Sequence, residues 1–224
     1  MNGARSVLPI AFAARSIAAA VVKNLGHSTD IENFKNICQL LLREERRGRI
    51  PLHLGALVLL EAEGRLASDD TVLFTMGCSI VARGDGGFGG PRGKGIPPHR
   101  VPRREPDLSC DIETRPDQAL LYRLTGDRNP LHADPSRAAA LGFDRPIMHG
   151  LCTFGIACRA ILRTICDYDY TLIEEFDARF SSPVIPGETI TTEMWQDGNV
   201  ISFSCRVQER GEIVLRNGRC ILRA

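Results

Sequence analysis

The sequence predicts an α+β protein, in which mainly helical segments are followed by a set of antiparallel strands. Apolar side chains have helical spacing over much of residues 117–166, with loops at 125–134 and 142–148. Residues 176–222 instead are predicted to be antiparallel strands, and over residues 201–208 apolar and polar side chains alternate, as in a half-buried strand. Helices and strands that are segregated along a chain in this way are typical of α+β domains.

The first part of the chain is predicted to be helical and then to enter a strand. Residues 1–48 combine an Ala-rich stretch with apolar residues at helical spacing. No acidic residue precedes Asp30, so this start also resembles a mitochondrial transit peptide or a weak signal peptide. An ordinary amphipathic first helix is the preferred interpretation. Residues 70–83 have the period of two of a strand, with one face formed by Val72, Phe74, Met76, Cys78 and Ile80.

Residues 84–107 are predicted to be a linker, because they are dense in Gly, Pro and Arg. Residues 84–89 spell the dinucleotide fingerprint GxGxxG. That fingerprint requires a helix to begin directly after it, so that the helix N-terminus holds the pyrophosphate. Several prolines follow instead, so no nucleotide site is expected here.

Two turns are predicted in the strand region. Pro186 and Gly187 indicate a turn before a strand over residues 189–195. Asn217 and Gly218 have two interpretations, a hairpin turn or an irregularity within a last strand.

The bulk composition is that of a soluble globular protein, and nothing in it points to nucleic acid or to a membrane surface. The 224 residues are 43% hydrophobic and 25% charged, with a formal net charge of +1. We therefore expect no nucleic-acid partner and no membrane partner, and no apolar run is long enough to span a bilayer. The eight cysteines form no CxxC pair and have no zinc-ligand spacing. They are interpreted as reduced core thiols of a cytoplasmic protein, and no metal is predicted.

The loop at 125–134 holds the side chains with the clearest chemistry. Asp127 and His132 lie five residues apart, so they do not share a helical face, but a loop folded back around Asn129 and Pro130 would bring them together. In such a pair one group removes a proton from water while the other supplies a proton to the α-carbon of a conjugated thioester. The alternative is a turn-forming aspartate and a surface histidine. Asp134 and Pro135 predict a helix start that pins the loop at its exit.

A second candidate feature is the start of a long apolar helix over residues 150–166. Pro146 disfavours helix before it, so Gly150 is predicted to lie at the helix N-terminus with a free backbone amide. Such an amide suits the oxygen of a thioester that becomes an enolate. The alternative is a glycine that allows tight packing. For His149 we prefer a buried histidine paired to the backbone over a catalytic role.

Together these segments resemble the hydratase 2 motif of the MaoC-like dehydratases, which include the (R)-specific enoyl-CoA hydratases and the hydratase unit of the peroxisomal multifunctional enzyme. The resemblance covers roughly residues 70–222, and its most specific part is Gly-Asp-x-Asn-Pro-x-His. The segments that carry it are Tyr122–Pro135, Gly142–Gly155, residues 86–90, residues 178–180 with Pro183, Pro186 and Gly187, and residues 193–195. The resemblance implies a hot dog fold, an antiparallel sheet wrapped around one long helix.

The resemblance also implies a function, which is the hydration of trans-2-enoyl-CoA to (3R)-3-hydroxyacyl-CoA or the reverse dehydration in fatty-acid metabolism. It implies that Asp127 and His132 are the catalytic acid/base pair. Asn129 is expected to shape the catalytic loop, Gly150 to bind the thioester carbonyl through its amide, and Phe180 to contact the substrate. No cofactor and no metal are implied. The alternatives are a hot dog acyl-CoA thioesterase and a truncated, inactive hydratase homologue.

The front of the chain departs from the family pattern. Relatives with two hot dogs in one chain use the first to bind a long acyl tail, whereas residues 1–60 do not resemble such a module. We expect residues 1–83 to be a divergent remnant of a first hot dog, 84–107 a linker and 108–224 the hydratase domain. The acyl-CoA substrate is then the small-molecule partner, a homodimer is the expected assembly, and a eukaryotic source would make a mitochondrial or peroxisomal location the alternative.

Overall fold

The structure is a computed structural model that describes residues 56–65, 69–82 and 97–223, and the chain forms two compact units that divide at Pro97/Pro98. The predicted helix over residues 1–48, the targeting segment and most of the linker lie outside the described residues. In the first unit, strand β1 (Ala56–Arg65) pairs with strand β2 (Val72–Ala82) as an antiparallel hairpin. The strand predicted over residues 70–83 is therefore confirmed. Strand β1 was not predicted, because its first residues are a continuous apolar run without alternation.

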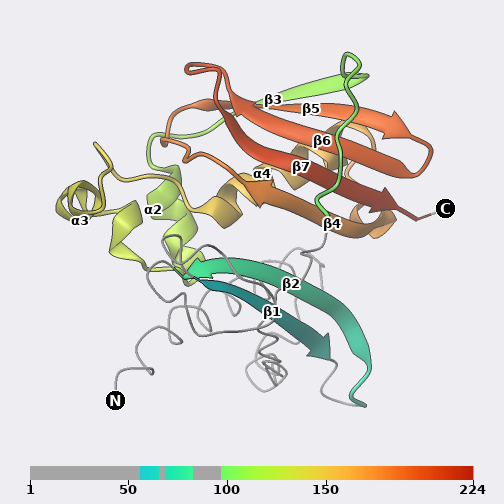
Figure 1. The fold of residues 1–224 in the computed structure, drawn as a ribbon, viewed down its shortest axis with the longest axis horizontal. Helices are drawn as coiled ribbons and strands as arrows, with labels where there is room; N and C mark the ends of the chain where they lie inside the picture. Colours follow the sequence, from blue (N-terminus) through green and yellow to red (C-terminus); the bar gives the residue numbers. More distant parts are fainter. Residues whose placement is uncertain (1–55, 66–68, 83–96, 224) are drawn as a thin grey trace. The chain divides into compact units, whose positions relative to one another are not determined.

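The second unit is a five-stranded antiparallel sheet with one long helix packed against it (Figure 1). The strand order is β3-β5-β6-β7-β4, so β3 and β4 form the two edges. The helix is α4 (Gly150–Thr164), which agrees with the helix predicted over residues 150–166. The strands are β3 (Leu108–Glu113), β4 (Ile173–Phe180), β5 (Thr189–Asp197), β6 (Val200–Val207) and β7 (Ile213–Leu222).

The core lies between α4 and the inner face of the sheet. Ala157, Ala160 and Ile161 of α4 are fully buried, as are Met194 of β5 and Phe203 of β6. At about 25 cal/mol for each Å² of apolar surface removed from water, this layer is the main source of stability. In β6 the predicted inner face is confirmed, because Ile201, Phe203, Cys205 and Val207 are all fully buried in this core.

The outer face of the sheet is also covered, which the alternation of residues did not predict. Trp195 and Ser202 pair across β5 and β6 and point away from α4, yet both are buried. The segment before β3 crosses strands β6 and β7 (Figure 1). His99 Nε2 is 2.8 Å from Ser202 Oγ, and Trp195 Nε1 donates to the Arg104 carbonyl at 2.8 Å. The end of the predicted linker is therefore part of the folded unit.

Short helices connect β3 to α4. They are α2 (Gln118–Tyr122), the 3-10 turns η2 (Arg123–Thr125) and η3 (Pro130–His132), and α3 (Pro135–Ala140); a further turn, η4 (Tyr170–Leu172), precedes β4. The predicted helix start at Asp134-Pro135 is confirmed, since the Asp134 side chain accepts from the Ser136 amide. The helical interpretation of residues 117–166 is confirmed apart from its loops. No helix among the described residues has the length and apolar character needed to cross a membrane.

Asn217 and Gly218 form an irregularity inside β7, which decides between the two interpretations. Asn217 has a φ of 56°, and the pairing registers of β7 with β4 and β6 shift next to it. A Cβ atom on Gly218 would lie 2.5 Å from the Phe203 ring. The glycine is therefore needed for the close approach of the backbone to the largest core side chain of β6.

The cysteines in the described part of the chain are free thiols. Five are buried in the second unit, as the core interpretation predicts: Cys110, Cys152, Cys166, Cys205 and Cys220. Burial raises the pKa of Cys205 to about 12, so this thiol remains protonated and unreactive at neutral pH. Cys78 on β2 is exposed.

Candidate active site

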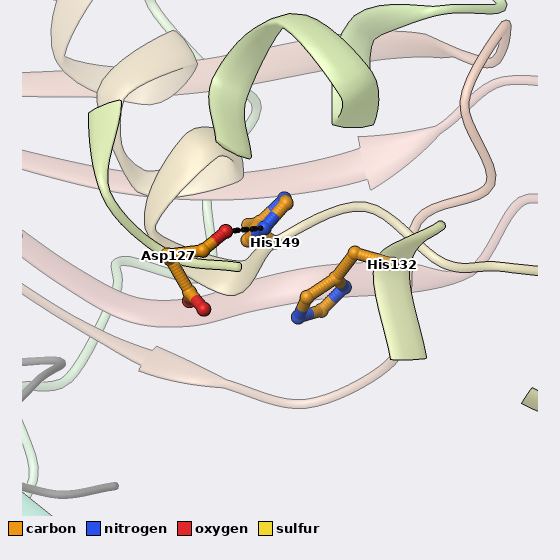
Figure 2. Close-up of side chains that lie close together, drawn as sticks. All are labelled: Asp127, His132 and His149. Carbon is orange, nitrogen blue, oxygen red and sulfur yellow. Dashed lines mark hydrogen bonds between the residues drawn. The ribbon is translucent and has the colours of Figure 1, made fainter. Parts of the chain in front are cut away.

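The loop between η2 and α3 folds back on itself through two successive side-chain turns. The Asn129 amide donates to Asp127 Oδ1 at 3.1 Å, and the Leu131 amide donates to Asn129 Oδ1 at 3.1 Å. Asp127 and Asn129 favour such turns because their short side chains reach the backbone two residues on. Asn129 thereby caps η3, and the loop places His132 beside Asp127 (Figure 2).

Three potential acid–base groups meet at this loop. One carboxylate oxygen of Asp127 and one ring nitrogen each of His132 and His149 all lie within 4.8 Å of one another. Asp127 is half-buried, while both histidines are buried. The side chains come from the loop, from η3 and from the residue before α4, so a single tertiary arrangement assembles them.

The ring orientation of His132 is set by a backbone carbonyl. His132 Nδ1 lies 2.8 Å from the Ile147 carbonyl oxygen, which can only accept. Nδ1 therefore carries the proton and Nε2 keeps its lone pair in the neutral ring. Nε2 is the nitrogen directed toward Asp127 (Figure 2), so this pair can take a proton from a water placed between them.

His149 is the N-cap residue of α4 and is 1% exposed. Its Nε2 lies 3.1 Å from the Asp127 carbonyl oxygen, as Figure 2 shows, and its ring stacks on His132 with centroids 3.8 Å apart. The Tyr122 ring contacts it as well, tilted by 45° with the ring centroids 4.7 Å apart. Burial, followed by the neighbouring His132, lowers the pKa of His149 to about 4. The prediction of a buried histidine paired to the backbone is confirmed.

Gly150 is the first residue of α4 and is exposed. The first amides of a helix have no partner in the preceding turn, and no acceptor for the Gly150 amide occurs among the described residues. A Cβ atom on Gly150 would lie 3.2 Å from Cε1 of Phe180. The ring of Phe180, at the end of β4, therefore lies directly over this glycine while remaining 49% exposed.

Asp127, His132 and His149 are residue types that bind metals, but their arrangement suits proton transfer better. The two imidazole rings are stacked with an angle of 28° between their planes. Nitrogen lone pairs lie in the ring plane, so stacked rings hold them in two nearly parallel planes that do not meet at one ion close to both rings. His149 Nε2 is further engaged with the Asp127 carbonyl.

All five predicted site residues lie around the start of α4 or the loop beside it, and three further groups were not predicted as part of the site. These are the Ile147 carbonyl, the Tyr122 ring and the stacked face of His149. Residue type carries no information on a backbone carbonyl, so Ile147 could not be found from the sequence. Tyr122 and His149 lie within the two segments that carry the family resemblance, Tyr122–Pro135 and Gly142–Gly155. That position was the one sequence feature that could have linked them to the site.

The chain resembles known proteins over most of its second unit. The MaoC like domain family matches residues 98–217. Among curated proteins, "Enoyl-CoA hydratase ChsH3" of Mycobacterium tuberculosis is 48% identical over 150 residues, which are 67% of this chain and 52% of that protein. "Enoyl-CoA hydratase 2, peroxisomal" of Arabidopsis thaliana is 40% identical over 173 residues, with coverages of 72% and 56%. The chain therefore spans about half the length of these relatives.

Solved structures give the same result. The full-length peroxisomal multifunctional enzyme type 2 from Drosophila melanogaster matches with a TM-score of 0.70 and 37% identity over 78% of this chain and 32% of that chain. A MaoC-like dehydratase from Phytophthora capsici matches with a TM-score of 0.69 and 36% identity, over 75% of this chain and 59% of that one. The implied hot dog fold is thus confirmed, and the chain belongs to the MaoC-like dehydratase family.

Proposed function

We propose that this protein is an (R)-specific enoyl-CoA hydratase, which adds water to a trans-2-enoyl-CoA or catalyses the reverse dehydration. The observation that carries the proposal is the meeting of Asp127 and His132 beside the exposed amide at the start of α4. The names of the relatives, two of which are enoyl-CoA hydratases, support the same reaction.

The pair Asp127 and His132 activates the water. The water oxygen bonds to the β-carbon of the enoyl group while its O–H bond breaks, and the released proton passes to one of the two side chains. A proton is delivered from this pair to the α-carbon as the carbon–carbon π bond breaks, so one water balances the reaction. Positioned acid–base groups of this kind typically contribute about 10²- to 10⁴-fold in rate.

Gly150 stabilises the charge that develops during the addition. As the β-carbon is attacked, electrons move onto the thioester oxygen, which becomes enolate-like. The Gly150 amide donates a hydrogen bond to that oxygen, and the positive end of the α4 dipole favours the negative charge. Because Gly150 has no side chain, the oxygen can approach the amide closely.

Phe180 and Asn129 have supporting roles in the proposed site. The half-exposed Phe180 ring above Gly150 contacts apolar parts of the substrate next to the thioester. Asn129 holds the loop through its bond from the Leu131 amide, which keeps Asp127 in place.

We further propose that the working form is a homodimer or larger, in which two copies of the hot dog of residues 108–224 are juxtaposed. Edge strands β3 and β4 each have one free side within the described sheet. Several large apolar side chains of the segment between β3 and α4 remain exposed, and contiguous apolar surface of this kind usually marks an interface; they are Leu120, Leu121, Leu124 and Leu141. Light scattering on active protein tests this, and a fully active monomer would contradict it. The cytoplasmic location stays a prediction.

The experiment that tests the reaction is an ultraviolet assay for loss of the conjugated enoyl-CoA band, with substrates of graded acyl length. We expect turnover with a preference for short or medium chains. Free thiol is measured in parallel, because its release would indicate the alternative acyl-CoA thioesterase. A monodisperse protein that leaves every enoyl-CoA unchanged would contradict the proposed function.

A further inference from the structure

We propose that His149 is a positioning residue, a neutral clamp that fixes both members of the catalytic pair at once through the Asp127 backbone and the His132 ring. The inference rests on the proposed function, which assigns Asp127 and His132 as the catalytic pair. His149 itself is not placed in contact with substrate.

One imidazole ring makes both contacts. Its Nε2–H donates to the Asp127 carbonyl at 3.1 Å, which restrains the backbone that carries the carboxylate. Its face stacks on His132 at 3.8 Å, while the other ring contact of His132 is the hydrogen bond from Nδ1 to Ile147. His132 is therefore held by one bond in its plane and one ring across its plane. Since His149 is the N-cap of α4, the clamp is anchored to the longest helix of the described unit.

The surroundings of His149 require the neutral Nε2–H tautomer. A carbonyl oxygen can only accept, so Nε2 carries the proton. Nδ1 is buried and has no hydrogen-bond partner among the described residues. The groups that face the ring are Tyr122 from α2, Arg123 from η2, Asp127 from the loop and His132 from η3. A second proton on Nδ1 would have no acceptor and would place a charge against His132, and burial already keeps the pKa of His149 far below its usual range.

The unpaired Nδ1 argues that His149 does more than fill space. A buried polar atom without a partner is unfavourable for folding. A phenylalanine ring at this position would occupy a similar volume and could stack on His132 without any unpaired atom. What histidine offers that phenylalanine lacks is the Nε2–H donor to Asp127, so the position is best explained by that bond.

Two variants separate the clamp from packing. His149→Phe keeps the ring but removes the donor, while His149→Gln supplies an amide donor but removes the ring. For His149→Phe we expect an unchanged or higher Tm, a kcat lowered at least about tenfold, and a KM within about twofold, since a misplaced catalytic group affects the transition state more than binding. His149→Gln should have a lower Tm than His149→Phe but a higher kcat.

That reversed order cannot come from a packing role, in which activity follows stability. The matched control is His99→Phe, a histidine of the outer segment that contacts Ser202 on the face of the sheet opposite α4; its kcat should equal that of the wild type. A His149→Phe protein with wild-type kcat, or a His149→Gln protein that is less active than His149→Phe, would overturn the proposal.

A second measurement is independent of turnover. Nitrogen NMR of isotope-labelled histidine rings reports the tautomer, and the signal lost in His149→Phe identifies the residue. We expect a neutral ring protonated on Nε2 at pH 7, whereas a ring protonated on Nδ1 or on both nitrogens would contradict the clamp. If the wild type hydrates no enoyl-CoA but shows this tautomer, the proposed function fails while the geometry assigned to His149 stands.

Discussion

Two helices of the second unit begin in opposite ways. At α3 the Asp134 carboxylate accepts from the Ser136 amide and hydroxyl, at 2.8 Å and 2.7 Å, and Pro135 occupies the first helical position. At α4 the N-cap residue His149 makes no side-chain cap, and the first helical residue is the exposed Gly150. One helix start is closed by its own side chain, whereas the other is open.

The difference shows that two neighbouring helix starts can have different roles, one structural and one in binding. A closed start satisfies its amides internally, and here it pins the exit of the loop that carries Asp127 and His132. An open start leaves amides for an external acceptor, and it belongs to the longer helix, whose apolar face is anchored in the core. The side chain that would have capped α4 is instead directed at Asp127. We infer that the start of α3 stabilises the loop of the site, whereas the start of α4 binds the substrate through its free amides.

The largest effect is expected for Asp127 and His132, in the loop that leads into the closed start of α3. Asp127→Asn and His132→Ala should each lower kcat by at least about a hundredfold, because each removes a positioned acid or base. If both act on one water, the double variant should be little worse than either single variant. Steady-state kinetics measure this. Near wild-type turnover in either single variant would contradict the assignment of Asp127 and His132 as the catalytic pair.

Closing the open start of α4 should have the next largest effect. Gly150→Val places side-chain atoms against the Phe180 ring and over the amide, so we expect a loss of kcat of about a hundredfold, or about 3 kcal/mol. Phe180 is half-exposed and can move, so Tm should change little. The matched control is Gly155→Val in the same helix, where a Cβ meets nothing within 4 Å. A collapsed melt with a proportionate loss of activity would favour a packing role for Gly150.

His149 should make the stability of the protein depend on pH. Its pKa is lowered from 6.5 to about 4 in the folded protein, so below pH 6.5 the unfolded chain takes up a proton that the folded protein refuses. The free energy of unfolding should therefore fall as the pH drops from 6.5 to 4, by up to roughly 3 kcal/mol relative to His149→Phe. Denaturant melts of both proteins across this range test it, and parallel pH curves would contradict it.

The smallest effect is expected at the closed start. Asp134→Ala removes the cap of α3, so Tm should fall by a few degrees and kcat only slightly, through a looser loop exit. Because hydrogen bonds from Ser136 lower the pKa of Asp134, the wild type should lose this advantage as the pH falls through the acidic range, and the variant should not. A loss of kcat as large as that of Gly150→Val would show that the two helix starts are not functionally different.

The sequence predicted much of the second unit because its signals are local. Each of these signals depends on a few residues that are close together in the sequence. They are the alternation in β6, the Asp134-Pro135 helix start and the apolar run after Gly150. Strand β1 was missed because a continuous apolar run does not distinguish strand from helix. The outer segment was taken for linker because its contacts with Trp195 and Ser202 come from residues about a hundred positions away.

The site shows the same limit. Asp127, His132 and Gly150 could be proposed from turn chemistry, helix ends and the family resemblance. The cluster of the Tyr122, His149 and His132 rings could not, because it depends on how α2, η3 and α4 meet in space. The Ile147 carbonyl that fixes the tautomer of His132 belongs to the backbone and carries no sequence signal.

The most direct test of the central claim is chiral analysis of the product that the wild-type protein forms from a short trans-2-enoyl-CoA, with Asp127→Asn as the control. Loss of the enoyl band with formation of (3R)-3-hydroxyacyl-CoA, abolished in the control, is the predicted result. Formation of the (3S) product, release of free thiol, or an equal rate in the Asp127→Asn protein would contradict the assignment of this site.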